Sequence, residues 1–234
     1  MKILITSGGT KIPLDLVRHI GNMSNGTLGS RMAKELLEKG HEVLFFRAEK
    51  SKSPMSMNVD FNDEYEIPQI QDWTDLRDFY ENHKDKYTEF WYKTFEDYQE
   101  GLETIIKEYK PDMVILAAAV SDYAPETVVK GKIRSKGDLT IQLKPLPKVI
   151  SNVREWAGDK AKIVGFKLLV DVEEKELLDA AFDSLNKNKL DLVCANDLRT
   201  ILNGSHKLWL CKAGMCCDYE HTELTDAILS WTKE

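Results

Sequence analysis

The segment Lys2-Ile3-Leu4-Ile5-Thr6-Ser7-Gly8-Gly9-Thr10 decides the fold, because an apolar run typical of a buried strand ends there in two glycines. A long polar turn follows, and then an amphipathic helix with apolar residues at helical spacing, namely Leu28, Met32, Leu36 and Leu37, and with Gly40 just past its end. Glycines after a strand let backbone N–H groups approach phosphate oxygens, and the helix offers its positive end to the same anion. The sequence therefore predicts a nucleotide or phosphate site here. The alternative is that the glycines only form a tight turn.

The polar turn between Thr10 and the helix contains three side chains that packing alone would not need, those of Arg18, Asn22 and Ser24. The segment differs from the compact G-x-G-x-x-G fingerprint, because a loop bearing Arg18 and Asn22 separates its two glycine clusters. We therefore expect this turn to contribute side chains to the site.

Composition sets the limits of these expectations. The chain has 234 residues, of which 42% are hydrophobic and 30% charged, enough for one large α/β domain with a real core. A net charge of −7 argues against nucleic acid or an anionic membrane as the partner. No apolar run reaches the roughly 18 residues of a membrane span, and Met1 leads directly into a core strand without a signal peptide. We expect a cytoplasmic protein.

The four cysteines all lie in the last quarter of the chain. Cys194 belongs to an apolar strand, which predicts a small core residue. Cys211, Cys216 and Cys217 lack the spacing of a zinc site. Cys216 and Cys217 are adjacent and can oxidise, but we expect a reduced state. We assign the cysteines no function.

Strands alternate with helices along most of the sequence. Apolar runs predict strands at Lys2–Thr6, Val43–Phe46, Met113–Ala119, Ile163–Phe166 and Leu192–Ala195, with an edge strand at Leu208–Cys211. Helical spacing predicts helices after Pro147 (through Val149, Ile150 and Val153), over Glu173–Asn188 and over Thr222–Trp231. This order predicts an α/β fold with a doubly wound, mostly parallel, Rossmann-like sheet in a single domain, 1–234.

Two segments interrupt the alternation. An insert at about 49–110 begins with an irregular stretch, Glu49–Pro68, and continues through an aromatic-rich stretch, Asp72–Tyr109, whose spacing suits one or two helices. We interpret its aromatic residues as a packing or subunit-contact face rather than a ligand cage. A flap at about 124–146 contains the basic stretch Lys130–Asp138, followed by Leu139–Leu143, and predicts a hairpin that projects from the sheet.

Four strand ends carry small or polar residues, which allow a ligand to approach the backbone. They are Gly8-Gly9, Ala117–Asp122, Gly165-Phe166 and Asn196-Asp197. Because the carboxyl ends of parallel strands meet at one edge of a sheet, we expect them to converge on one ligand crevice.

Taken together, these residues resemble the phosphopantothenate–cysteine ligase family over nearly the whole chain. The resemblance is carried by Thr6-Ser7-Gly8-Gly9-Thr10, the Asp15-x-Val17-Arg18-x-Ile20-x-Asn22-x-Ser24-x-Gly26-x-x-Gly29 block, Ala117–Tyr123, Lys132-Ile133, Pro147, Gly165-Phe166 and Ala195-Asn196-Asp197. The chain looks like the stand-alone bacterial form, since no decarboxylase domain precedes Met1, and a separate decarboxylase is then a possible partner. The stand-alone group, rather than the fused bacterial enzymes, is also indicated by the run Gly165-Phe166-Lys167-Leu168-Leu169-Val170-Asp171.

The resemblance implies a reaction. A nucleoside triphosphate activates the carboxylate of 4′-phosphopantothenate as an acyl-nucleotide, pyrophosphate leaves, and the amine of L-cysteine then forms the amide. It implies Mg²⁺ carried by the nucleotide, with no metal held by the protein itself, CTP as the favoured nucleotide with ATP as the alternative, and a homodimer. Its partners are these small molecules, not nucleic acid or membrane.

The resemblance also implies roles for particular residues. Asn22 and Lys132 are the expected catalytic residues, and Arg18, Ser24 and Gly26 bind the substrate. The expected nucleotide-binding residues are Gly8, Gly9, Thr10, Ala118, Ala119, Asp122, Pro147, Lys148 and Phe166. Without the resemblance, Arg18 would be read as a salt-bridge partner, Lys132 as an exposed lysine, Asp122 as a turn cap and Asn22 as tolerating a left-handed backbone.

This chain departs from the fused bacterial enzymes at two places. They have Asn-Pro-Asp where it has Leu146-Pro147-Lys148, and two lysines where it has Ser184 and Asn188. The cations near these positions and the predicted crevice are Lys148, Lys167 and Lys187. We therefore expect the phosphate contacts of the fused enzymes to be redistributed in this chain.

Two other functions stay open: a nicotinamide-dependent reductase and a non-catalytic nucleotide-sensing module. Reductases of this fold usually end the second strand with an acidic residue, but here it ends in Phe45-Phe46-Arg47. The only Tyr-x-x-x-Lys spacing, Tyr80 to Lys84, lies inside the aromatic insert. A sensing module would not need Lys132 or Asn22.

Overall fold

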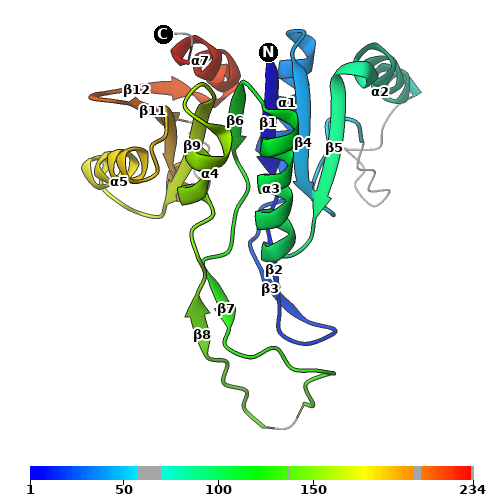
Figure 1. Cartoon of the computed structure of the whole chain (residues 1–234), viewed down its shortest axis with the longest axis vertical. Coiled ribbons are helices and arrows are strands. Elements are labelled where there is room, and N and C mark those ends of the chain that lie inside the picture. Colours follow the sequence, from blue (N-terminus) through cyan, green and yellow to red (C-terminus); the bar gives the residue numbers. More distant parts are fainter. Residues whose placement is uncertain (57–69, 136, 203–206, 233–234) are drawn as a thin grey trace. The chain divides into compact units, whose positions relative to one another are not determined.

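The computed structural model describes residues 1–56, 70–135, 137–202 and 207–232 (Figure 1). The chain forms two compact units. The first contains Met1–Leu4, Leu102–Ala117 and Lys148–Glu234, and the second contains Ile5–Gly101 and Ala118–Pro147. Strand β1 (Lys2–Ser7) and helix α3 (Phe95–Tyr109) each contribute residues to both units.

The first unit is built on parallel strands that continue into an antiparallel edge. Strand β9 (Lys162–Leu169) pairs in parallel with β6 (Met113–Leu116) and β10 (Leu192–Asp197). Beyond β10, strands β11 (Lys207–Lys212) and β12 (Met215–Glu220) form an antiparallel hairpin. The helices of this unit are α4 (Ile150–Ala157), α5 (Glu174–Lys187), α6 (Leu198–Leu202) and α7 (Leu224–Trp231), with a 3-10 turn at His221–Glu223.

The second unit continues from the end of β1. Strands β4 (Glu42–Ala48) and β5 (Tyr87–Tyr92) pair in parallel, and two small hairpins join β2 (Lys11–Pro13) to β3 (His19–Gly21) and β7 (Tyr123–Pro125) to β8 (Leu143–Pro145). Its helices are α1 (Thr27–Glu38) and α2 (Ile70–His83), the latter followed by a 3-10 turn at Lys84–Lys86.

The strand order is β12-β11-β10-β9-β6-β1-β4-β5, an eight-stranded, mostly parallel sheet. The predicted α/β fold is therefore confirmed. The apolar runs that predicted β1, β4, β6, β9 and β10 are buried, because both faces of a parallel sheet are covered. No helix in the described ranges is long and apolar enough to cross a membrane.

The aromatic-rich stretch differs from the prediction of helices alone, because β5 lies between α2 and α3. Its aromatic residues divide into two groups. Tyr92 and Tyr98 are buried and pack against Phe46, with ring centroids 4.9 and 5.7 Å from it. Trp73, Tyr80 and Trp91 are exposed. The predicted packing face is thus real for the residues next to β4. Part of the irregular stretch predicted at Glu49–Pro68 lies outside the described residues.

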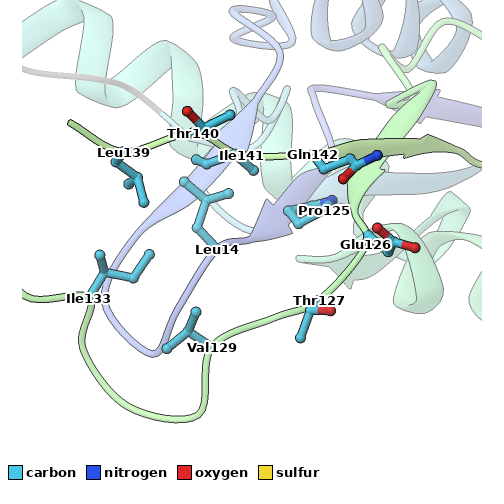
Figure 2. Close-up of a pocket in the computed structure, with 10 residues that line it drawn as sticks. All are labelled: Leu14, Pro125, Glu126, Thr127, Val129, Ile133, Leu139, Thr140, Ile141 and Gln142. Carbon is cyan, nitrogen blue, oxygen red and sulfur yellow. The ribbon is translucent and has the colours of Figure 1, made fainter.

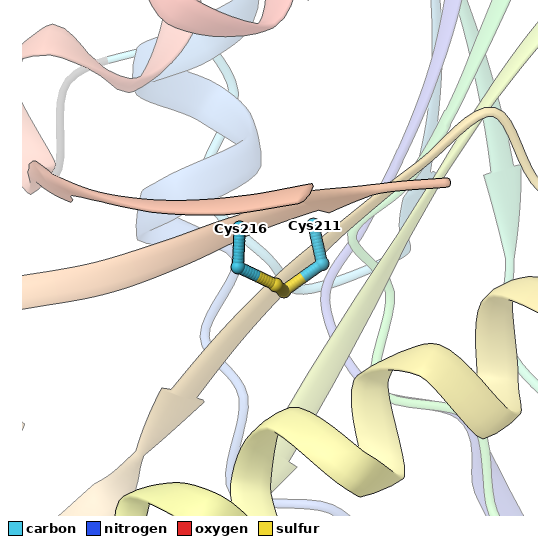
Figure 3. Close-up of a disulfide and its surroundings, with 2 residues drawn as sticks. All are labelled: Cys211 and Cys216. Carbon is cyan, nitrogen blue, oxygen red and sulfur yellow. A yellow bond between two sulfur atoms is a disulfide. The ribbon is translucent and has the colours of Figure 1, made fainter. Parts of the chain in front are cut away.

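The β11–β12 hairpin corrects two expectations, one about its cysteines and one about the edge of the sheet. Cys211 and Cys216 form a disulfide across the β11–β12 hairpin, where the sequence predicted reduced thiols (Figure 3). The expected edge strand also has β12 outside it, since β12 pairs along the whole of β11. Cys194 is buried as predicted, and burial raises the pKa of its thiol.

Tyr92 ties β5 to the glycine turn, because its buried hydroxyl donates to the carbonyls of Ser7 at 2.7 Å and Gly8 at 3.1 Å. We expect Tyr92→Phe to lower the free energy of unfolding by about 1–2 kcal/mol, since it leaves these carbonyls without that donor. Urea titration followed by circular dichroism measures the change. Tyr80→Phe, the same substitution at an exposed tyrosine, is the control. A change below 0.5 kcal/mol at Tyr92, about the size of an ordinary surface substitution, would contradict this tie.

Candidate functional site

The glycine turn after β1 adopts a backbone that few other residues can. Gly8 has φ +86°, and a Cβ placed on it would lie 2.7 Å from the Cβ of Ser51. A side chain at this position would therefore clash with its neighbour in a conformation that L-residues rarely adopt. The turn leaves its peptide groups close to the chain that follows β6.

Ala119 binds this turn on both sides. Its N–H donates to the carbonyl of Gly8 at 2.8 Å, and its carbonyl accepts from the N–H of Thr10 at 3.1 Å. The side chain of Thr10 adds two bonds to Ser121, accepting from its N–H at 2.9 Å and donating to its hydroxyl at 3.0 Å. The N–H of Ala118 donates to the hydroxyl of Thr6 at 3.1 Å. The structure thus brings together five predicted site residues, Gly8, Gly9, Thr10, Ala118 and Ala119.

Asn22 joins the same cluster from the polar turn. Its Nδ2 donates to the carbonyl of Ala119 at 2.6 Å, and its side chain is exposed. A Cβ on Gly9 would lie 3.0 Å from the carbonyl oxygen of Asn22, so the missing side chain at Gly9 allows this close approach. The site therefore presents an exposed amide beside two backbone loops.

Arg18 is engaged within the chain. Its Nη1 donates to Oδ2 of Asp15 at 2.8 Å and to the carbonyl of Ile133 at 3.2 Å, and its side chain is 40% exposed. The structure thus shows the salt bridge that the sequence left open as an alternative. Lys132, the residue before Ile133, is exposed.

Asp15 is the functional candidate that residue-by-residue reading missed. It belongs to the Asp15–Gly29 block that carries the family resemblance, but no role was predicted for it. A backbone hydrogen bond from Ile133, reinforced by those of Val17 and Arg18, holds the pKa of the Asp15 carboxyl well below its usual range, against the opposing effect of burial. The available signal was an Asp placed two and three residues before N–H donors, the pattern of an Asx turn.

The remaining predicted residues of the second unit lie at the ends of its elements. Gly26 caps the N-terminus of α1, and its carbonyl accepts from the Ser7 hydroxyl at 3.1 Å. Ser24 is exposed in the loop before it. The carbonyl of Asp122 accepts from Leu146 N–H at 2.8 Å, which closes the base of the β7–β8 flap, and Pro147 ends that unit.

The first unit has a cavity of its own, about 550 Å³, between the start of α4, β9 and α5. It is lined by Lys148, Ile150, Phe166, Lys167, Ala180, Asp183, Ser184, Lys187 and Asn188. The predicted residues Lys148 and Phe166 therefore lie together. Three lysines on its walls suit a polyanionic ligand.

The two positions where the fused enzymes carry lysine form a neutral network here. Asn188 donates through Nδ2 to the carbonyl of Ser184 at 2.9 Å, and its Oδ1 accepts from the Ser151 hydroxyl at 3.2 Å. Asn188 is buried, so this polar side chain is satisfied by the protein itself. The cations of the cavity are instead Lys148, Lys167 and Lys187. That all four predicted strand ends share one crevice stays a prediction.

Comparison with known proteins places these features in a family. Residues 1–64 and 93–219 match the family model of the DNA/pantothenate metabolism flavoprotein C-terminal domain. The chain is 32% identical over 198 residues to the coenzyme A biosynthesis bifunctional protein CoaBC of Thermococcus kodakarensis, covering 85% of this chain and 41% of that protein. It therefore spans about two fifths of the length of this curated relative.

A second relative is shorter. Phosphopantothenate–cysteine ligase 1 of Arabidopsis thaliana is 30% identical, and the match covers 85% of this chain and 69% of that protein. Among solved structures, a Cab2 mutant in complex with phosphopantothenate-cysteine matches with a TM-score of 0.75 and 25% identity, covering 100% of this chain and 89% of that one.

Proposed function

The chain belongs to the family of the DNA/pantothenate metabolism flavoprotein C-terminal domain, and on this premise we propose that it is a phosphopantothenate–cysteine ligase of coenzyme A biosynthesis. Acting as one ligase domain, it joins 4′-phosphopantothenate to L-cysteine through an acyl-nucleotide. The Arabidopsis relative carries the ligase name, and the Cab2 mutant was solved with phosphopantothenate-cysteine. The observation that carries the proposal is the Asn22 amide held against the Ala119 carbonyl beside the glycine turn.

The proposed first step makes a poor electrophile reactive. An oxygen of the substrate carboxylate attacks the α-phosphorus of the nucleotide, the bond to the bridging oxygen breaks, and pyrophosphate leaves with that electron pair. The amine of cysteine, after losing a proton, then attacks the acyl carbon, and the nucleoside monophosphate leaves. The protein has to hold the reacting groups together and stabilise negative charge at each step.

Asn22 suits the acyl-nucleotide, because an amide binds a phosphate or carbonyl oxygen without adding charge. Lys132 lies exposed on the flap and suits the departing phosphates. Gly8, Gly9, Thr10, Ala118, Ala119, Asp122, Pro147 and Phe166 are proposed to bind the nucleotide. Ser24, Gly26 and Arg18 are proposed to bind the pantothenate substrate, Arg18 through the exposed part of its guanidinium.

We assign the charges that meet the triphosphate in the first unit to Lys148, Lys167 and Lys187. The lysine positions of the fused enzymes hold Ser184 and Asn188, which bond to each other. Mg²⁺ is proposed to arrive with the nucleotide as part of the substrate. We favour CTP over ATP, because bacterial members of the resembled family generally use CTP.

The alternative functions have weaker support. A nicotinamide-dependent reductase would usually place an acidic residue at the end of β4, where Arg47 instead forms an ion pair with Glu89 at 2.8 Å. Tyr80, of the Tyr-x-x-x-Lys spacing, lies on α2. A sensing module would not need Asn22 or Lys132, to which the resemblance assigns catalytic roles.

We further propose a cytoplasmic homodimer, for which a separate decarboxylase supplies the substrate. Support for the dimer comes from apolar side chains exposed on the flap, on the β2–β3 turn and just after β3, namely Leu16, Val17, Met23, Tyr123, Leu139 and Leu143. Exposed apolar side chains of this kind are what a subunit interface would cover.

The ligase proposal predicts that pyrophosphate forms only when phosphopantothenate, a nucleoside triphosphate and Mg²⁺ are all present. A coupled pyrophosphate assay measures this, and we expect kcat/KM to be higher for CTP than for ATP. Pyrophosphate release that proceeds equally well without phosphopantothenate would contradict the ligase. A tenfold preference for ATP would overturn only the choice of nucleotide.

The reassigned phosphate contacts predict a second result. Lys167→Gln and Lys187→Gln should each raise KM for the nucleotide by roughly threefold to tenfold, because each removes a charge from a partly exposed anion site. Lys175→Gln, an exposed lysine of α5 outside the cavity, is the matched control. If Lys167→Gln and Lys187→Gln both bind the nucleotide as the parent and the control do, the cavity is not the triphosphate site.

The dimer predicts a molar mass by sedimentation equilibrium of about twice the 26.8 kDa of one chain at micromolar concentration. Leu143→Glu should shift the protein toward monomer, because it places a charge among the exposed apolar residues of the flap. Met215→Glu, at an exposed apolar residue on β12, is the control. A wild-type monomer with full activity would exclude the dimer.

A further inference from the structure

The carboxylate of Asp15 is buried at the turn after β2 and accepts four hydrogen bonds. Its Oδ1 accepts from the N–H groups of Val17 at 2.7 Å and Arg18 at 2.6 Å. Its Oδ2 accepts from Arg18 Nη1 at 2.8 Å and from the N–H of Ile133 at 2.9 Å. The last bond joins two residues 118 positions apart in the sequence, so it connects the turn to the flap.

The flap backbone is held on both sides of Lys132. Before it, the carbonyl of Gly131 accepts from Leu16 N–H at 3.0 Å. After it, Ile133 donates to Asp15 and accepts from Arg18, so both of its peptide groups are engaged. Three residues earlier, Val129 N–H donates to the carbonyl of Leu14 at 3.1 Å. Lys132 itself stays exposed, and none of the hydrogen bonds or ion pairs found among the described residues involves its ammonium.

Apolar side chains support the same attachment. A cavity of about 210 Å³ lies between the turn and the flap, and Leu14, Val129 and Ile133 are among the side chains that line it (Figure 2). Leu139 and Ile141, from the returning arm of the flap, lie near Leu14. The side chain of Ile133 thus faces this apolar cluster while its backbone bonds to Asp15 and Arg18.

We propose that Asp15 is a positioning residue, which fixes the peptide groups around Lys132 so that the lysine meets an anionic phosphate ligand from a preset place. A cation on a loose loop would lose conformational entropy when it bound, whereas a fixed backbone has already lost most of it. The chemistry of the ligand is that of a polyphosphate. Its identity as the nucleotide rests on the proposed ligase function, but the attachment of the flap does not.

The attachment is tested without any ligand. Asp15→Asn replaces one carboxylate oxygen by an N–H donor, so it can no longer accept all four bonds. We expect limited trypsin digestion after Arg134, followed by mass spectrometry, to be about tenfold faster in this variant, since proteolysis follows the population of the open form. Asp138→Asn, an exposed carboxylate of the same flap, should leave the rate unchanged. Equal rates in Asp15→Asn and the parent would overturn the attachment.

The positioning role of Asp15 is tested by a double-mutant cycle that combines Asp15→Asn with Lys132→Gln. Asp15→Asn should raise KM for the nucleotide by about tenfold in the parent and by less than about twofold when Lys132→Gln is also present. Kcat at saturating nucleotide should change less than KM. Faster digestion together with the same KM effect in both backgrounds would mean that the attachment is structural only, and would overturn the positioning role. A parent protein with no ligase activity would contradict the proposed function instead, and the digestion result would still stand.

A second variant covers the case in which Asp15→Asn does not fold. Ile133→Ala weakens the apolar contact with Leu14 and Val129 but leaves the Asp15 carboxylate and its partners in place. It should accelerate cleavage after Arg134 and raise KM for the nucleotide in the same direction, again only when Lys132 is present. An Ile133→Ala protein that matches the parent in both measurements counts against the proposal.

Discussion

The backbone of Ala119 makes the contacts on which the candidate site of the second unit depends. Its N–H donates to the Gly8 carbonyl, and its carbonyl accepts from both Thr10 N–H and the Asn22 amide. A Cβ on Gly9 would lie 3.0 Å from the carbonyl oxygen of Asn22, and one on Gly8 would lie 2.7 Å from the Cβ of Ser51, so both glycines allow the turn to be this close to its neighbours. The glycine turn and Asn22 are therefore both held at Ala119, about 100 residues later in the sequence, and this contact positions the amide of Asn22.

Much of the fold follows directly from the sequence. The strands that the apolar runs predicted are buried because parallel strands have both faces covered, which makes their sequences nearly continuous in apolar residues. Strand β5 escaped prediction since Tyr87–Tyr92 mixes aromatic residues with Thr88 and Glu89 inside a segment of helical spacing. Strand β12 was not predicted either, because Met215–Glu220 is no continuous apolar run and none of its residues is fully buried. It is held in the sheet by its pairing with β11.

Some parts of the candidate site were likewise predicted from the sequence, and others were not. Gly8, Gly9 and Ala119 were predicted because small residues after a strand carry a clear physical meaning, whereas Asn22 was predicted from the polar turn and from the family resemblance. The bond from Ile133 to Asp15 was not, since nothing in a single sequence pairs a turn with a flap 118 residues later. The neutral contact between Ser184 and Asn188 was not predicted either. The sequence showed that these two positions lack the lysines of the fused enzymes, and the structure shows that the two residues bond to each other.

The interleaving of the two units has a consequence for the order of assembly. The chain passes from one unit to the other after Leu4, Gly101, Ala117 and Pro147. During synthesis, every residue of the second unit has been made once Pro147 has emerged, whereas the first unit still lacks β9 to β12 and α4 to α7. Strand β6 of this unit must wait for its parallel partner β9, and closing such a loop is a step that slows folding. The half that holds Asn22, Lys132 and the glycine turn can thus become ordered first, while the strand Met113–Leu116 remains exposed until the C-terminal third arrives.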